Sequence, residues 1–269
     1  YPVTVWNRDA TKTSSPADKG ALVASSIAEL CQQSDLIMLC VSDAKAVAEI
    51  VLSESGILAN ISAGQVIVDF SSIDPETTRD LAAKVATKGC TWLDTPVSGG
   101  VAGAEQGSLA IMAGGDAEVL DSLRPVLQCL SQRVTRMGDV GAGQVTKICN
   151  QMIVSCNVLV IAEVMAMAKR AGVDAAKIPQ ALTGGFADST PLQLTGSRMA
   201  VQDFDEIKWH VKTLLKDLDM AKVLAKNNQS STPLAGLGAE LMRMHASKGF
   251  NNSDPSTLIE MNLAKDLDN

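Results

Sequence analysis

The sequence predicts an α/β fold with a doubly wound parallel sheet, followed by an all-α domain. Two observations predict it. Up to about residue 138, short apolar runs alternate with helix-length segments, which is typical of parallel strands joined by helical crossovers. Beyond that point no run resembles a strand, and residues 143–171 form one nearly unbroken helical pattern. We therefore expect a sheet domain at 1–140 and a helical domain at 141–269, bridged by the helix at 143–171.

The first half contains six runs with the composition of strands. The run Leu36–Val41 is continuously apolar, as expected for a strand buried on both faces of a parallel sheet. Asp74 and Pro75 mark a helix start, with the aspartate as N-cap and the proline in the first turn. The expected strands are 3–6, 36–41, 65–70, 91–93, 109–113 and 133–137, and the expected helices are 44–51, 75 to about 89, and 117–130.

The second half consists of helices separated by turns. Gly172 ends the long helix, since glycine readily closes a helix at its C-terminal end. Residues 183–191 are rich in glycine and polar residues, and we expect a loop there. Further helices are expected at 175–182, 207–227, 234–248 and 256–263.

Composition narrows the range of functions. With 46% hydrophobic residues among 269, the chain can bury a sizeable core. Its net charge of −7 opposes non-specific binding to nucleic acid, and 3% aromatic residues leave little for base stacking. We therefore expect a small-molecule partner and no nucleic acid.

Cysteine usage and hydropathy predict the compartment. None of the six cysteines forms a C-x-x-C pair and only two histidines are present, so we expect no metal site and a reducing environment. The apolar run Met152–Ala168 contains Ser155, Asn157 and Glu163, and we expect it to be too short and too polar to span a membrane. No signal peptide is recognised, and we expect a cytoplasmic protein.

The most informative segment is the glycine-rich turn at 138–143 and the helix start that follows it. Lys147 and Gln151 lie four residues apart on one helix face, with Asn150 close to that face. A cation and two amides at a helix start suit the binding and protonation of a small oxygen-bearing substrate. The helix dipole favours the neutral amine there, which assists proton transfer near neutral pH. An ordinary solvated lysine is the alternative interpretation.

Two further segments are candidate binding sites. Ser98, Gly99 and Gly100 follow a strand, and the free backbone N–H groups with the serine hydroxyl suit a carboxylate. Asn7 and Arg8 stand at the end of the first strand, where an arginine suits the 2′-phosphate of NADP and an acid suits NAD. A plain glycine loop and a surface arginine are the respective alternatives.

Together these residues resemble the β-hydroxyacid dehydrogenase family, which includes 3-hydroxyisobutyrate dehydrogenases, tartronate semialdehyde reductases and glyoxylate/succinic semialdehyde reductases. Four motifs in the right order carry the resemblance, and it extends over essentially the whole chain. They are Asp69-Phe70-Ser71-Ser72-Ile73-Asp74-Pro75, the stretch 94–100, the stretch 141–151, and Lys216-Asp217-Leu218.

The resemblance implies a Rossmann-like cofactor domain and a helical domain through which the chain forms a homodimer or homotetramer. It implies that Lys147 is the catalytic residue. The implied substrate-binding residues are Ser98, Gly99, Gly100, Asn150 and Gln151. The implied cofactor-binding residues are Asn7, Arg8, Cys40, Val41, Ser72 and Lys216, with NADP (NADPH) preferred over NAD.

The resemblance predicts NAD(P)-dependent reduction of a short carboxylated aldehyde to a hydroxyacid. Glutamine at 151 and the segment 184–190 are most similar to 2-hydroxy-3-oxopropionate (tartronate semialdehyde) reductases. The alternatives are a 3-hydroxyisobutyrate dehydrogenase, a glyoxylate/succinic semialdehyde reductase, or a non-catalytic oligomerisation module. Imine reductases usually replace the lysine, and phosphogluconate dehydrogenases carry a histidine where this chain has Cys149, so both are disfavoured.

The sequence departs from the family pattern at its start. Tyr1 begins at the family's second strand, so the first strand, the G-x-G-x-x-G turn and the first helix are missing. Removing an interior strand would leave unpaired edges and uncovered apolar surface, and no polar substitution compensates. We therefore expect the natural protein to carry residues ahead of Tyr1.

Overall fold

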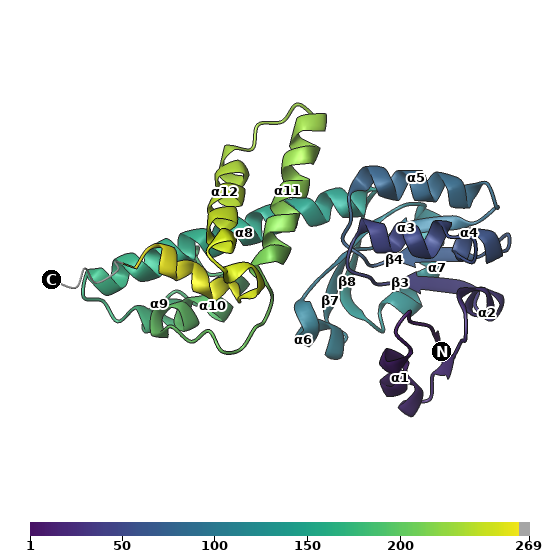
Figure 1. The fold of residues 1–269 in the computed structure, drawn as a ribbon, viewed down its shortest axis with the longest axis horizontal. Coiled ribbons are helices and arrows are strands. Elements are labelled where there is room, and N and C mark those ends of the chain that lie inside the picture. Colours follow the sequence, from purple (N-terminus) through teal and green to yellow (C-terminus); the bar gives the residue numbers. More distant parts are fainter. Residues whose placement is uncertain (264–269) are drawn as a thin grey trace. The chain divides into compact units, whose positions relative to one another are not determined.

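The computed structural model describes residues 1–263. The chain divides into two compact units, the first from Tyr1 to Lys147 and the second from Ile148 onward. The division falls inside α8 (Ala142–Arg170), whereas the glycine pattern of the sequence places the boundary at residue 140. Figure 1 traces both units along the chain.

The first unit is built on a six-stranded sheet of order β3-β4-β5-β7-β6, with β8 paired to β7. Three strands run parallel and in register, so that Leu39, Asp69 and Asp94 stand side by side where these strands end. The strands are β3 (Leu36–Leu39), β4 (Val66–Asp69), β5 (Thr91–Asp94), β6 (Val97–Ser98), β7 (Leu109–Gly114) and β8 (Ser131–Gly138).

The sheet has a parallel core of β3, β4 and β5, as expected, and β7 departs from that direction. β7 runs antiparallel to both β5 and β6, while β8 is parallel to β7. The connection from β5 to β7 contains only β6 and the six-residue helix α6 (Gly100–Glu105). Because β6 pairs antiparallel with β7 and α6 is only six residues long, the connection lacks a full-length crossover helix, and the chain returns antiparallel.

Helices cover both faces of the sheet, as the doubly wound pattern predicts. α3 (Ala44–Leu52), α4 (Ile57–Asn60) and α5 (Pro75–Ala86) bury their apolar faces against Ile37 and Ile67. On the other face α7 (Ala117–Leu127) packs against Val68 and Leu93. Since neighbouring residues of one strand point to opposite faces, each central strand contributes to two cores.

Aspartate N-caps set the helix starts. Asp43, Asp74 and Asp116 each accept a backbone N–H from three residues further on, at 2.9, 2.7 and 2.9 Å. These side-chain bonds satisfy donors that the first turn of a helix leaves free. The start at Asp74 and Pro75 is the one that the sequence predicts.

The N-terminal segment forms a separate two-stranded parallel sheet. β1 (Thr4–Val5) pairs with β2 (Leu22–Val23), and the short helices η1 (Ala10–Thr13) and α1 (Ser14–Asp18) connect them. The sequence predicts β1 as the longer strand 3–6. It does not indicate β2, α1, α6 or α2 (Ile27–Gln32), because two- to six-residue elements have too little periodicity.

The second unit is helical throughout the residues that the structure describes. Met165 of α8 packs in one core with Leu218 of α11 and Met242 of α12, and Figure 1 shows these three helices together. The elements after α8 are η2 (Ala175–Lys177), α9 (Ile178–Ala181), α10 (Thr190–Val201), α11 (Val211–Asn227), α12 (Pro233–Ser247), η3 (Phe250–Asn252) and η4 (Pro255–Met261).

Three helix predictions in this unit are corrected. α10 was not predicted, although Ser189 caps it and Pro191 stands in its first turn, since both residues fall inside the glycine-rich segment assigned to a loop. α11 begins at Val211 rather than at 207, because the Lys208 backbone N–H donates to Asp254 at 2.8 Å and holds that stretch outside the helix. The segment at 255–261 is a 3₁₀-helix.

α8 is the one helix among residues 1–263 that is long and apolar enough to cross a membrane by length and composition. Its mean hydropathy reaches 1.8 over the best window, so the expectation that this run is too short and too polar is wrong on that criterion. Val158, Ala162 and Met165 of this helix are completely buried in the core of the second unit. The core helix of a protein passes the same test, which makes the hydropathy weak support for a membrane span.

Candidate active site

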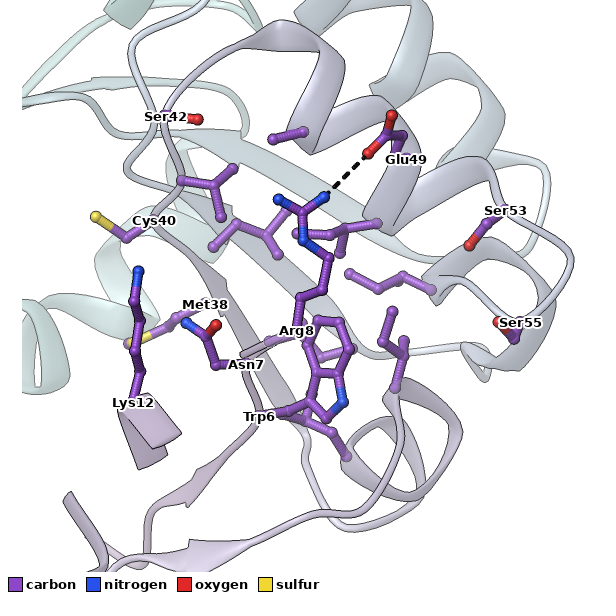
Figure 2. Close-up of a pocket in the computed structure, with 18 residues that line it drawn as sticks. Trp6, Asn7, Arg8, Lys12, Met38, Cys40, Ser42, Glu49, Ser53 and Ser55 are labelled. Atoms are coloured by element: carbon purple, nitrogen blue, oxygen red, sulfur yellow. Dashed lines mark ion pairs between the residues drawn. The ribbon is translucent and has the colours of Figure 1, made fainter. Parts of the chain in front are cut away.

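A pocket of about 740 Å³ opens in the first unit beside the ends of β1 and β3. Asn7 and Arg8, which follow β1, line it together with Cys40 and Val41, which follow β3. Figure 2 shows Arg8 extending across the pocket toward α3. The structure therefore brings together four of the residues for which the sequence predicts cofactor binding.

The turn after β1 is shaped by its own hydrogen bonds. Asn7 Oδ1 accepts the Asp9 backbone N–H at 2.9 Å, and Asp9 Oδ1 accepts the Thr11 hydroxyl at 2.7 Å. These bonds from Thr11 hold the pKa of the Asp9 carboxyl below its usual value, so it stays ionised as the cap of η1. Arg8 stands between these two anchored residues.

Two cations line the pocket, Arg8 and Lys12. Arg8 Nη1 lies 3.6 Å from Glu49 Oε2, and the two side chains are 85% and 51% exposed. An ion pair this exposed contributes little stability, so the guanidinium can exchange Glu49 for a better anion at small cost. Sequence reasoning singled out neither Lys12 nor Glu49, since only the fold places η1 and α3 at one pocket.

The lining fits part of a dinucleotide. Two cations suit a phosphate, and the apolar side chains of Leu30, Ile37 and Ile50 suit a base or a ribose face. A glycine-rich turn after the first strand, which cradles the pyrophosphate in dinucleotide sites, does not occur in residues 1–263. The residues that line this pocket therefore fit a phosphate and the adjoining base or ribose of a dinucleotide, and they do not include a pyrophosphate-binding turn.

A second cluster stands where β4 and β5 end. Asp69 and Asp94 are opposite each other in the register, and both are completely buried. Burial raises the pKa of Asp69 to about 6, opposed by the hydrogen bond from the Ser71 N–H at 2.9 Å. Burial also raises the pKa of Asp94, and the N–H groups of Gly141 and Gln144 that donate to it at 2.8 and 2.9 Å act in the opposite direction.

Asp94 therefore caps the start of α8 from 47 residues away in the chain. In the sequence, Asp94 stands directly after the expected strand 91–93, and nothing local indicates that it caps a distant helix. The cap orients the first turn of the helix that carries Lys147, which is half-buried one turn further on. A fully solvated lysine, the alternative interpretation, does not match this burial.

The predicted carboxylate loop lies between β6 and α6. Gly99 and Gly100 have φ values of 137° and 65°, in the left-handed region that favours glycine. A Cβ on Gly99 would also lie 3.1 Å from Leu109 Cδ2. Ser98 is half-buried, whereas both glycines are exposed. Ser72 is half-buried in the loop after β4, outside the pocket at Arg8.

In the second unit two predicted residues, Gln151 and Lys216, contact one acid, Asp217, and a third, Asn150, bonds to Gln151. Gln151 Nε2 donates to Asp217 Oδ2 at 2.5 Å, and Asn150 Nδ2 donates to Gln151 Oε1 at 2.9 Å. Lys216 Nζ lies 3.6 Å from Asp217 Oδ1, and the Asp217 side chain is only 3% exposed. The Asp217 carboxylate is therefore buried, although the side chain of its neighbour Lys216 is 37% exposed.

The fold and these residues define a class: an oxidoreductase with a dinucleotide-binding sheet and a following helical domain. Residues 1–138 match the family described as the NAD binding domain of 6-phosphogluconate dehydrogenase. Residues 141–262 match the family described as NAD-binding of NADP-dependent 3-hydroxyisobutyrate dehydrogenase. The chain belongs to the β-hydroxyacid dehydrogenase family and is an NAD(P)-dependent hydroxyacid dehydrogenase.

Relatives and solved structures extend this similarity. The 2-hydroxy-3-oxopropionate reductase of Escherichia coli K12 is 36% identical over 90% of this chain and 82% of that protein. The 3-hydroxyisobutyrate dehydrogenase of Pseudomonas aeruginosa is 33% identical over 85% of this chain and 79% of that protein. The structure of Psf3 in complex with NADP⁺ and 2-OPP has a TM-score of 0.87 at 26% identity, over 97% of this chain and 92% of that one.

Proposed function

We propose that the chain catalyses NADPH-dependent reduction of a short carboxylated aldehyde, with tartronate semialdehyde (2-hydroxy-3-oxopropionate) as the preferred class of substrate. The observation that carries the proposal is Lys147, a half-buried amine near the start of a helix that is capped by a buried carboxylate. The similarity to a 2-hydroxy-3-oxopropionate reductase over most of the chain supports the choice of substrate.

NADPH, when bound, supplies the hydride that reduces the carbonyl carbon. Lys147 as an ammonium ion polarises the carbonyl oxygen and gives it a proton, which completes the hydroxyl group of the product. In the oxidative direction the neutral amine takes that proton back. Ser98, Gly99 and Gly100 hold the substrate carboxylate through the serine hydroxyl and backbone N–H groups. Gln151, fixed by Asp217 at 2.5 Å, binds an oxygen near the reacting carbon.

We assign the preference for NADPH over NADH to Arg8 and Lys12. Both line the pocket beside β1, and the exposed pairing of Arg8 with Glu49 leaves the guanidinium free to rearrange. An arginine binds a phosphate through two parallel charge-assisted hydrogen bonds, which a ribose hydroxyl cannot match. Asn7, Cys40, Val41, Ser72 and Lys216 are the other residues that we assign to the cofactor.

A rate panel tests the function. The purified protein is assayed with tartronate semialdehyde, glyoxylate, methylmalonate semialdehyde and succinate semialdehyde, each with NADPH and with NADH. We expect the highest kcat/KM with tartronate semialdehyde and NADPH. A higher value with another aldehyde assigns the alternative substrate. No turnover with any aldehyde, together with no change in nicotinamide fluorescence on titration, would instead support a non-catalytic assembly module.

We further propose a homodimer or homotetramer formed through the second unit. Ile153, Val160 and Met167 of α8 recur every seven residues and are 65%, 49% and 65% exposed. Residues seven apart lie on one helix face, so these side chains form an apolar stripe, which is the kind of surface that oligomers bury. A second copy of the chain, presenting the same stripe, is the occupant that a symmetric interface requires.

A further inference from the structure

A buried network, separate from the proposed catalytic groups, holds the start of α8 in the first unit. Gln144 is completely buried, and its side chain crosses from the first turn of α8 to the loop after β4. Its Oε1 accepts the Ile73 N–H at 3.2 Å, and its Nε2 donates to the Ser71 carbonyl oxygen at 2.8 Å. Its backbone N–H donates to Asp94 Oδ2 at 2.9 Å. One residue thus connects α8, β5 and the loop after β4.

The network continues to the pocket beside β3. Ser71 Oγ accepts the Val41 N–H at 3.0 Å, and Val41 lines that pocket. Ser72, the next residue along the loop, is another position that we assign to the cofactor. Lys147 lies three residues after Gln144 in α8. Gln144 therefore links the helix that carries the proposed proton donor to two loops on the cofactor side.

The backbone around Gln144 is closely packed against the sheet. A Cβ on Gly143 would lie 2.4 Å from the Met112 carbonyl oxygen and 2.6 Å from that of Asp94. A Cβ on Gly114 would lie 2.5 Å from Asp94 Oδ1. These contacts prevent the start of α8 from moving closer to the sheet. The two bonds of the Gln144 amide, together with the Asp94 cap, also oppose rotation of the helix about its own axis.

We propose that Gln144 is a positioning residue for Lys147: its amide locks the rotation of α8 against the Ser71–Ile73 loop. The inference deepens the proposed reductase function and rests on it. A catalytic group displaced by about 1 Å can lose 10²-fold in rate, so the orientation of α8 matters for proton donation. Both partners of the amide are backbone groups, which makes the lock independent of any bound molecule.

The test compares Gln144→Met with Gln65→Met. Gln65 is a matched control, because its amide also bridges backbone groups in the same unit, accepting the Ser62 N–H and donating to the Cys31 and Ser34 carbonyl oxygens. It stands just before β4, at the opposite end of the strand from the Ser71–Ile73 loop. We expect Gln144→Met to lower kcat by tenfold or more while the Kd for NADPH changes less than threefold. In Gln65→Met we expect kcat within twofold of the wild type.

Amide hydrogen exchange, measured on the protein without cofactor, reports directly on the hydrogen bonds of the Gln144 network. In Gln144→Met we expect faster exchange both in residues 71–73 and in residues 142–147, with neither change in Gln65→Met. The inference would be overturned if exchange in Gln144→Met became faster in α8 alone, or if its kcat did not change. It would also be overturned if both variants lost kcat equally, or if Gln144→Met lost only affinity for NADPH. Absence of turnover in the wild type would count against the proposed function, whereas the exchange result decides the network by itself.

A second variant keeps the test valid if Gln144→Met does not fold. In Gln144→Glu the protonated carboxyl can still donate to the Ser71 carbonyl oxygen, but the ionised form cannot. The Asp94 carboxylate, which accepts the backbone N–H of residue 144 from β5, disfavours ionisation there, as burial does. We expect the kcat of Gln144→Glu relative to the wild type to rise as pH falls. If the ratio of the Gln144→Glu kcat to the wild-type kcat does not change with pH, the proposed role of the Gln144 amide is contradicted.

Discussion

At the scale of single residues, the chemistry depends on how each charged group is paired. Lys147 is half-buried near a capped helix start, and Arg8 is 85% exposed with only a weak partner. A half-buried amine is suited to proton transfer, since its surroundings are fixed before the substrate arrives. An exposed guanidinium is suited to capturing an anion from solvent. The same type of charge thus serves two different proposed roles.

For Lys147 we expect Lys147→Ala to lower kcat by about 10²–10⁴-fold, the usual contribution of a general acid. The Kd for NADPH, followed by nicotinamide fluorescence, should change little. Lys169→Ala is the control, because Lys169 is an exposed lysine near the other end of the same helix. Near-normal turnover in Lys147→Ala would remove the catalytic assignment.

For Arg8 we expect Arg8→Ala to raise the Kd for NADPH by about 10–100-fold, as loss of charge-assisted hydrogen bonds to a phosphate implies. The Kd for NADH should change less than threefold. Lys45→Ala is the control, since Lys45 also lies near Glu49, at 3.9 Å, but does not line the pocket. Equal weakening of both nucleotides would exclude a contact with the 2′-phosphate.

At the scale of elements, the position of α8 in the first unit is set by close backbone contacts. Gly143 stands against the carbonyl oxygens of Met112 and Asp94, where a methyl group has no room. Gly236 in α12 is also a helical glycine, but a Cβ there would meet nothing within 4 Å. Glycine at 143 therefore allows close packing of α8, whereas glycine at 236 only lowers the stability of α12.

These two glycines give an opposed pair of predictions. Gly143→Ala should lower the free energy of unfolding by about 1–3 kcal/mol, because overpacking forces the backbone apart. Gly236→Ala should raise it by roughly 0.5–1 kcal/mol, because alanine is the better helix former. Urea denaturation of both variants measures the difference. A stability gain in Gly143→Ala would contradict the packing at the start of α8.

Many of the strands and helices could be predicted from the sequence. Alternating apolar runs identified six strands, and the Asp74-Pro75 pair located the start of α5 within one residue. The antiparallel turn at β5–β7 could not be predicted, since it depends on the short connection through α6. α10 was missed because its cap, Ser189, resembles loop composition. Local patterns identify long elements well. They identify poorly the short elements and strand directions that depend on contacts between distant residues.

At the scale of the whole molecule, the proposed assembly rests on the apolar surface that the second unit leaves exposed. The apolar stripe of Ile153, Val160 and Met167 faces solvent along the helix that also forms the core of the second unit. Burying such a stripe against a second copy removes apolar area from water and stabilises the oligomer. Cytoplasmic location stays a prediction.

We expect Ile153→Glu to shift the protein toward monomer in sedimentation velocity, since a charge in the stripe opposes burial. Val101→Glu is the control, because Val101 is 72% exposed on α6 in the first unit. A wild-type protein that sediments as a monomer at micromolar concentration would contradict assembly through the second unit. So would an oligomer that Ile153→Glu leaves intact.

The sequence by itself determined the order of strands and helices, the two-part organisation and the candidate motifs around Lys147, Ser98 and Arg8, because those signals are local. Only the tertiary structure decided that Asp94 caps α8, that Gln144 connects α8 to the Ser71 loop, and that Asp217 is buried beneath Gln151. These bonds join residues 47, 73 and 66 positions apart. Partners so far apart leave no periodic trace in the chain, and only packing brings them within hydrogen-bonding distance.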